Sequence, residues 1–187
     1  MKIRDILFTE HDIIDLVESI SYIPDDLTWN GDTASFTIHG HKYSATVQPA
    51  SPEAEKTYAQ FFTPPPKVGN VDFSLYINDL TTTQDAVGTV NHGVFKVFGS
   101  VAHIVSELIN RRGYQIILCI AKRQHSPTNY DQRVSAYNEI TYRAAKNAGK
   151  AHMKMYETPN ETVYAIFDHN LQGGMKQIQQ HTNGLSQ

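Results

Sequence analysis

The sequence predicts one α/β or α+β domain in which helices pack on a mixed, mostly antiparallel sheet. Two patterns indicate this class. Apolar and polar residues alternate over residues 27–48 and 71–77, as in half-buried strands, whereas residues 94–110 carry apolar side chains at helical spacing. The chain has 187 residues, 40% of them hydrophobic, which suffices to bury one core. We therefore expect a single domain over residues 1–168.

The N-terminal region is predicted to hold a helix followed by a β-meander. A capping-box spacing opens a run of apolar residues at helical intervals, so a short amphipathic helix is expected over residues 9–20. The period then changes to two around an Asn-Gly pair, which predicts a three-stranded meander over residues 27–48. Residues 48–69 contain five prolines, and we expect a connection there with one helical turn around residues 53–60.

The second half is predicted to alternate strands and helices. The helix from residue 94 has a wide apolar stripe, and Gly113 is placed to end it. Residues 115–121 are continuously apolar, which is typical of a central strand covered on both faces. The expected order is strand 71–77, helix 94–110, strand 115–121, helix 129–148, strand 152–157 and strand 162–168, and the first two of these strands are expected to be parallel neighbours.

The C-terminal residues 169–187 are predicted to form a mobile tail. They contain two adjacent glycines and several glutamines, and few large apolar side chains. Such a composition supplies little surface for burial. We therefore expect this segment not to pack on the domain.

Composition excludes several classes of protein. Sixteen basic and nineteen acidic residues give a net charge of −3, which does not indicate a nucleic-acid partner. The single cysteine, Cys119, excludes an intramolecular disulfide and a cysteine-based zinc cluster. No apolar stretch approaches the roughly 20 residues of a membrane span, and no export signal is recognised. The expected location is cytoplasmic, which for a viral gene means the host cytoplasm or the virion.

No metal site is predicted. His39 and His41 are two residues apart, but Gly40 between them indicates a turn, and the spacing shows no third ligand. The chemical interest of the sequence lies instead in the segment that leads into the helix at residue 94.

That segment is the candidate anion site. In open α/β sheets, ligands favour the carboxyl ends of the strands, where unpaired amides at a helix start attract negative charge. Here two glycines permit a close backbone approach and a lysine adds a cation, although glycines in such a place also serve simple chain reversal. The candidate cofactor-binding residues are Gly88, Asn91, Gly93, Val94, Phe95 and Lys96. A second cationic cluster, Lys122-Arg123, follows the central strand and gives a weaker alternative as a phosphate binder.

A family resemblance rests on the order of elements over residues 71–168, and two short motifs accompany it. Val97-Phe98-Gly99-Ser100-Val101 lies in the first helix, and Arg133-x-x-x-Tyr137 lies in the helix after the central strand. The order of elements, with a glycine-bearing loop before the first helix and a tyrosine in the second, resembles the GNAT acyltransferase superfamily. The two motifs resemble those of a group of phage-encoded proteins of unknown role. The resemblance implies that acetyl-CoA or a related acyl-CoA places its pyrophosphate near residues 88–95. It also implies that Tyr137 donates a proton to the departing thiolate.

Two hypotheses for function remain open. The first is a GNAT-like acyltransferase, or a degenerate relative, that binds an acyl-CoA-type cofactor. The second is a non-enzymatic viral protein that binds a host or virion protein. Tyr137 belongs to the apolar stripe of its helix, so a buried tyrosine with a hydrogen-bond partner is the structural alternative to a catalytic role.

Overall fold

The computed structural model describes residues 22–38, 40–77, 80–82, 94–122 and 130–185, and the helix expected over residues 9–20 lies outside them. The strands are β1 (Thr28–Asn30), β2 (Thr33–Ile38), β3 (His41–Pro49), β4 (Val68–Ile77), β5 (Leu80–Thr82), β6 (Ile116–Lys122), β7 (Ala151–Glu157) and β8 (Glu161–Phe167). The α-helices are α2 (Pro52–Ala59), α3 (Val94–Arg112), α4 (Tyr130–Asn147) and α5 (Gln172–Leu185).

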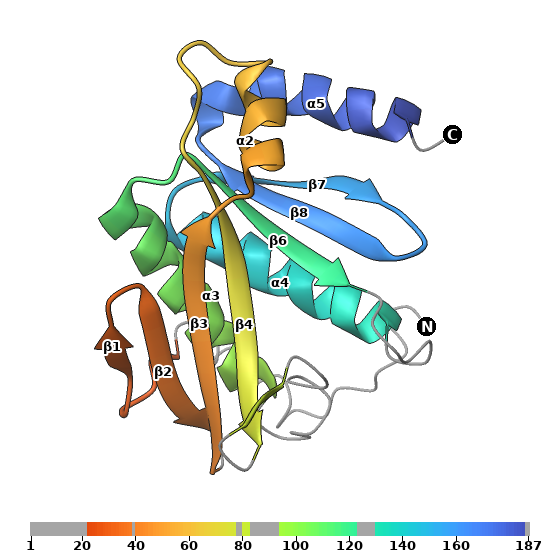
Figure 1. Cartoon of the computed structure of the whole chain (residues 1–187). Coiled ribbons are helices and arrows are strands. Elements are labelled where there is room, and N and C mark those ends of the chain that lie inside the picture. The colour runs from red at the N-terminus through yellow and green to blue at the C-terminus, as the bar shows by residue number, and fades with distance from the viewer. Residues whose placement is uncertain (1–21, 39, 78–79, 83–93, 123–129, 186–187) are drawn as a thin grey trace.

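Within the described residues, eight strands form one sheet (Figure 1). The order is β1-β2-β3-β4-β6-β8-β7, and β5 pairs with β4 beside this path. β4 and β6 are parallel, and the other pairs are antiparallel. The prediction of a mixed, mostly antiparallel sheet with packed helices is confirmed, and the class is α+β.

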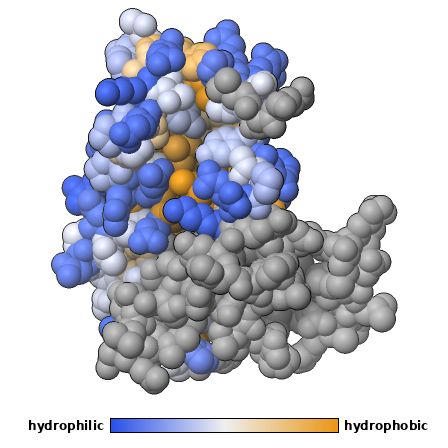
Figure 2. All heavy atoms as spheres, turned by 45° about the vertical axis from the view of Figure 1, so that its right-hand side comes forward, coloured by the Kyte–Doolittle hydropathy of each residue, from blue (hydrophilic) through white to orange (hydrophobic). Residues whose placement is uncertain are grey.

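Helices cover both faces of the sheet (Figure 1). α3 and α4 pack on one face, where a large core forms around buried residues such as Val101, Leu108 and Ile117. α2 and α5 lie on the other face over a smaller core that includes Leu118 and Phe167. The coloured, described residues on the face shown in Figure 2 are mostly hydrophilic, with a narrow band of apolar residues between them.

The predicted meander is confirmed as β1, β2 and β3. Gly31 and Gly40 turn the chain with positive φ angles of 62° and 80°, which glycine adopts at little steric cost. The guanidinium of Arg111 lies 4.5 Å from the ring centroid of Trp29 in β1. Arg112 forms an ion pair with Asp32 in the turn after β1. These contacts attach the edge of the sheet to the carboxyl end of α3.

The predicted central strand is also confirmed. β6 pairs with β4 on one edge and with β8 on the other. Consecutive residues of β6 point to opposite faces of the sheet, so Ile117 and Cys119 enter the larger core whereas Ile116 and Leu118 enter the smaller one. Burial on both faces explains why this segment is continuously apolar.

The helix after β3 is longer than the single turn that the prolines suggest. α2 spans eight residues, because Ser51 accepts a hydrogen bond from the amide of Ala54 at 3.2 Å and Pro52 occupies the first turn. A side-chain cap and an early proline both favour a helix start. Tyr58 is buried against the sheet and holds the helix in place.

The prediction of a mobile tail after residue 168 is wrong for the residues that the structure describes. A short 3₁₀ turn, His169–Leu171, leads into α5. Met175 and Ile178 are 0% and 2% exposed in the smaller core, and the Gln179 side chain donates to the carbonyl of Lys154 at 2.6 Å. Two apolar side chains three residues apart lie on one helix face, and they suffice to dock a helix that is otherwise polar.

We predict that the docking of α5 requires a residue without a side chain, glycine, at position 174. A Cβ on Gly174 would overlap the ring of Phe62, so Gly174→Ala should displace one of the two and destabilise the fold by roughly 1–3 kcal/mol. Gly173→Ala is the matched control, because a Cβ there meets nothing within 4 Å. Alanine also favours the helix more than glycine. Urea denaturation compares the two variants, and equal stabilities would contradict the docking.

Candidate functional site

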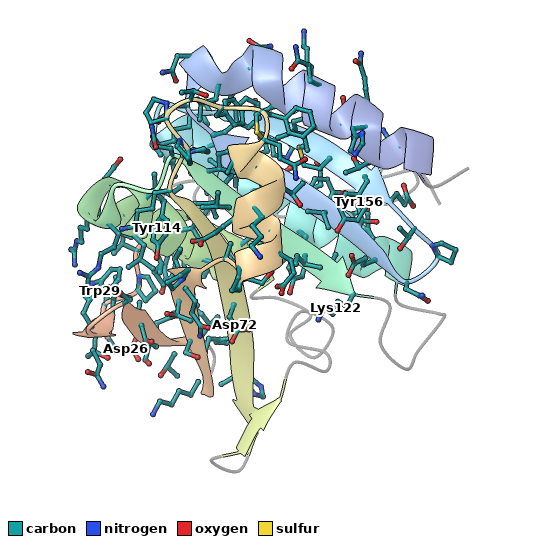
Figure 3. All side chains as sticks on the ribbon, turned by 45° about the horizontal axis from the view of Figure 1, so that its top comes forward. Asp26, Trp29, Asp72, Tyr114, Lys122 and Tyr156 are labelled. Atoms are coloured by element: carbon teal, nitrogen blue, oxygen red, sulfur yellow. The ribbon has the colours of Figure 1, made fainter. Side chains whose placement is uncertain are left out.

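The two parallel strands at the middle of the sheet stay paired for only three residues. Val68–Asn70 of β4 pair with Ile116–Leu118 of β6, after which the strands diverge toward their carboxyl ends (Figure 1). β4 continues to Ile77 and β6 continues to Lys122. We call the space between residues 71–74 of β4 and residues 119–122 of β6 the β4–β6 opening. Figure 3 shows Asp72 and Lys122 on its two sides.

The start of the opening is held by close packing. A Cβ on Gly69 would lie 2.9 Å from the Tyr114 ring, so this ring takes the place that a side chain at residue 69 would need. The ammonium of Lys67 lies 4.4 Å from the centroid of the same ring, and the amide of Gln115 donates to the carbonyl of Lys67 at 3.0 Å. The paired ends of β4 and β6 are therefore fixed, and the divergence begins at a defined residue, Asn70.

The divergence leaves backbone groups without strand partners. Among the described residues, no strand pairs with residues 71–74 on the edge of β4 that turns toward β6, or with residues 119–122 on the facing edge of β6. Backbone N–H and C=O groups need a partner, which is water, protein or a ligand. Unpaired strand edges are the kind of backbone to which an extended molecule with amide groups can add.

Three of the six predicted anion-binding residues lie outside the described part of the chain. Gly88, Asn91 and Gly93 belong to the residues that the structure does not describe. Val94 and Phe95 form the first turn of α3. Because α3 links parallel strands, its amino end lies on the side where β4 and β6 diverge (Figure 1).

Lys96, also in the first turn of α3, is half-buried. Its ammonium lies 5.2 Å from the centroid of the Tyr22 ring, and its carbonyl accepts a hydrogen bond from the Ser100 hydroxyl at 2.7 Å. A cation near a helix start adds to the positive end of the helix dipole. Lys96 thus lies in the first turn of the helix, as the sequence predicted, and the Tyr22 ring lies beside its ammonium.

Tyr137 is half-buried in α4 and packs against the larger core. One turn earlier, the carbonyl of Val134 accepts a hydrogen bond from the hydroxyl of Tyr164 at 3.3 Å. Tyr164 lies opposite Cys119 in the sheet, and Cys119 is the first residue of β6 beyond its pairing with β4. The face of α4 that carries Tyr137 therefore adjoins β6 where the opening begins.

The same side of the sheet holds a half-buried histidine. A ring nitrogen of His152 lies 3.0 Å from the hydroxyl of Thr141, and the imidazole stacks on Tyr164 with centroids 5.7 Å apart. Burial lowers the pKa of His152 below its usual 6.5, and the nearby carboxylate of Glu139 partly opposes this. The neutral imidazole is therefore the form that suits the packing of α4 on β7 and β8.

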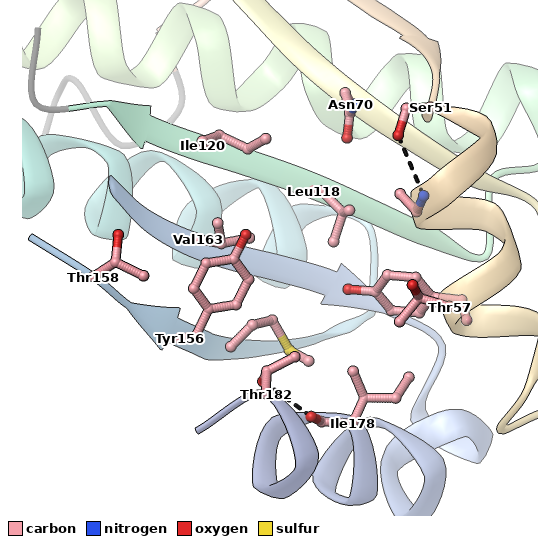
Figure 4. A pocket seen from close by; sticks show the side chains of 13 residues that line it. Ser51, Thr57, Asn70, Leu118, Ile120, Tyr156, Thr158, Val163, Ile178 and Thr182 are labelled. Carbon is pink, nitrogen blue, oxygen red and sulfur yellow. Dashed lines mark hydrogen bonds between the residues drawn. The ribbon is translucent and has the colours of Figure 1, made fainter. Parts of the chain in front are cut away.

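A pocket lies on the opposite face of the sheet, between α2, α5 and the strands (Figure 4). Its volume is about 420 Å³. α2 and α5 form two walls, while β4, β6, β7 and β8 provide the floor. The lining residues are Ser51, Ala54, Thr57, Tyr58, Asn70, Leu118, Ile120, Met155, Tyr156, Thr158, Val163, Ile178 and Thr182.

Sequence reasoning missed this pocket because it expected only one helical turn where α2 forms and a mobile tail where α5 forms. The signals for both helices were present. Ser51-Pro52 is a helix start, and Met175, Ile178 and Thr182 follow each other at helical spacing. What no local pattern could supply is that these helices cover the same face of the sheet as Leu118 and Ile120.

Metal binding finds no support in the described part of the chain, where no three histidine, cysteine or acidic side chains gather as ligands. His39 lies outside those residues, so the pair with His41 is not described. Arg123, of the second cationic cluster, also lies outside them. None of the described helices has the length and apolar character to cross a membrane.

Comparisons with known proteins give no match to any family model, any curated protein or any solved structure. The function must therefore be argued from the geometry of the chain itself.

We predict that protonation of His152 destabilises the fold. Its folded-state pKa lies below that of the unfolded chain, so the unfolded state binds more protons under acid conditions. The contribution of neutral His152 to the free energy of unfolding should be fully present above pH 6.5 and should decrease as the pH falls below this value. Urea denaturation at pH 7.5 and 5.5 measures this loss, which His152→Gln should reduce. The matched control, His169→Gln, changes an exposed histidine and should leave the loss intact; an unchanged loss in His152→Gln would contradict the assignment.

Proposed function

We propose that this chain is a GNAT-like acyltransferase, or a degenerate relative, that binds an acyl-CoA cofactor in the β4–β6 opening. The observation that carries the proposal is the divergence of two parallel strands after three residue pairs. The order β4, α3, β6, α4, β7 and β8, on which the family resemblance rests, agrees with this proposal.

The opening suits the chemistry of coenzyme A. The pantetheine arm of this cofactor is extended and carries two amide groups, which can pair with the strand edges at residues 71–74 and 119–122. Its pyrophosphate would then lie toward the amino end of α3, where helix amides and Lys96 favour negative charge. The expected binding residues Gly88, Asn91, Gly93, Val94 and Phe95 precede or begin that helix.

The proposed reaction assigns one proton transfer to Tyr137. An acceptor nitrogen attacks the thioester carbonyl, a C–N bond forms and the C–S bond breaks. The departing thiolate takes the phenolic proton of Tyr137, and the acceptor releases its own proton to water. General acid catalysis of this kind contributes about 10²- to 10⁴-fold. The position of Tyr137 on the side of α4 that adjoins β6 supports this role.

Acetyl-CoA should bind to the folded protein and raise its melting temperature by mass action. Lys96→Ala should weaken this binding and reduce its dependence on salt, because a cation near the pyrophosphate is removed. Calorimetric titration at two salt concentrations measures both effects. The matched control is Lys176→Ala, which removes an exposed cation on α5 and should leave binding unchanged. No binding at millimolar acetyl-CoA would contradict the proposal and favour a non-enzymatic viral protein that binds a host or virion protein.

Tyr137→Phe should lower the release of CoA thiol from acetyl-CoA about 100-fold in the presence of an amine panel, and keep the affinity for acetyl-CoA. The substitution removes the proton donor and retains the ring that packs in the core. Tyr142→Phe is the matched control, since Tyr142 lies on the same helix and is 51% exposed. If both variants release thiol at the same rate, Tyr137 is not the proton donor.

A further inference from the structure

The pocket between α2 and α5 has an uncharged lining. None of its thirteen lining residues is acidic, basic or a histidine, and six of them are aliphatic or methionine. Burying a charged group in such a place is costly, because no opposite charge is present to offset the loss of water. Its volume of about 420 Å³ lies within the range of about 300–1,000 Å³ for small-molecule sites. The lining therefore selects for a neutral, largely apolar molecule.

Most polar groups of the lining are already bonded within the protein. The hydroxyl of Ser51 caps α2, that of Thr57 donates to the carbonyl of Glu53 at 2.9 Å, and that of Tyr156 donates to the Glu161 carboxylate at 2.9 Å. Thr182 donates to the carbonyl of Ile178 at 3.0 Å. These groups hold the walls in place, so they contribute less to the choice of a ligand.

Two polar groups of the lining make no hydrogen bond with the described residues. The amide oxygen of Asn70 is enclosed and accepts no hydrogen bond. Tyr58 is buried, and its hydroxyl makes no hydrogen bond with the described residues. Burial also raises the pKa of Tyr58, which keeps this hydroxyl a proton donor at neutral pH.

These two groups complement each other chemically. Figure 4 shows the side chain of Asn70 at the edge of the pocket, with its oxygen directed toward Leu118. The terminal torsion of an asparagine is soft, so a small rotation of the amide presents this oxygen to a ligand. Leaving an enclosed acceptor without a partner is unfavourable, and a ligand donor offsets this cost. Tyr58 supplies the matching donor.

We infer that the pocket binds an uncharged small molecule with an aromatic or aliphatic body and a primary amide or comparable neutral group, whose N–H donates to Asn70 and whose oxygen accepts from Tyr58. A carboxylate of the same shape offers no donor to Asn70 and brings a charge into the uncharged lining. An ammonium offers no acceptor to Tyr58. The site is separate from the proposed cofactor contacts at the strand edges, although it begins at Asn70, where β4 and β6 part.

The test compares two probes of the same shape that differ in charge, 2-naphthamide and 2-naphthoate, by NMR titration of the full chain without coenzyme A. The amide should bind at least tenfold more tightly than the carboxylate. Tyr58→Phe should weaken binding of the amide about three- to tenfold, as expected for one lost hydrogen bond. Tyr156→Phe is the matched control, because it removes a lining hydroxyl that is already bonded to Glu161, and it should leave the affinity unchanged.

Three results would overturn the inference: equal affinities for the two probes, equal effects of the two tyrosine variants, or no binding of the amide. Ala54→Leu adds a check that does not depend on a hydrogen bond, since a larger side chain on α2 fills the pocket and should abolish binding while the melting transition is retained. Because coenzyme A is absent from these titrations, their failure is distinct from a failure of the proposed acyl-CoA binding.

Discussion

The short parallel pairing of β4 with β6 is the constraint on which the rest of this structure depends. Three residue pairs join the meander half of the sheet to the β6–β8–β7 half. The Tyr114 ring occupies the space beside Gly69, so the strands meet closely at one end. Beyond Asn70 they part, and the connection through α3 brings a helix start to the side where they part. A longer pairing would close the sheet and remove the opening.

The two faces of the sheet are used differently. The face under α3 and α4 is filled by the larger core, and the contact between Tyr164 and Val134 fixes α4 against it. The other face is covered by two shorter helices, and the gap between them holds the pocket. The pocket thus lies on the face that carries the smaller core. Both proposed binding regions adjoin β6, which like β8 is buried on both faces.

Much of the fold could be predicted from the sequence because its elements have strong local patterns. The meander, α3, β6, α4 and the final hairpin each show apolar residues at the period of their own structure. α5 has only a sparse pattern of this kind: glycines and glutamines dominate its composition, and its burial depends on Met175 and Ile178 meeting a sheet face formed by distant segments. Of the candidate site, Lys96 could be proposed from its place at a helix start and Tyr137 from the family resemblance, whereas Tyr58 and Asn70 carry no local signal for a pocket.

By itself the sequence determined the type and order of most elements, though not of α5, together with the absence of a cysteine framework and the nearly neutral charge balance, since each depends on neighbouring residues or on composition. The tertiary structure alone decided where β4 and β6 separate, which helices share a face, and that Asn70 and Tyr58 line one uncharged pocket. These features join residues far apart in the chain. Their energies come from burial and strand pairing between distant segments, which no local pattern records.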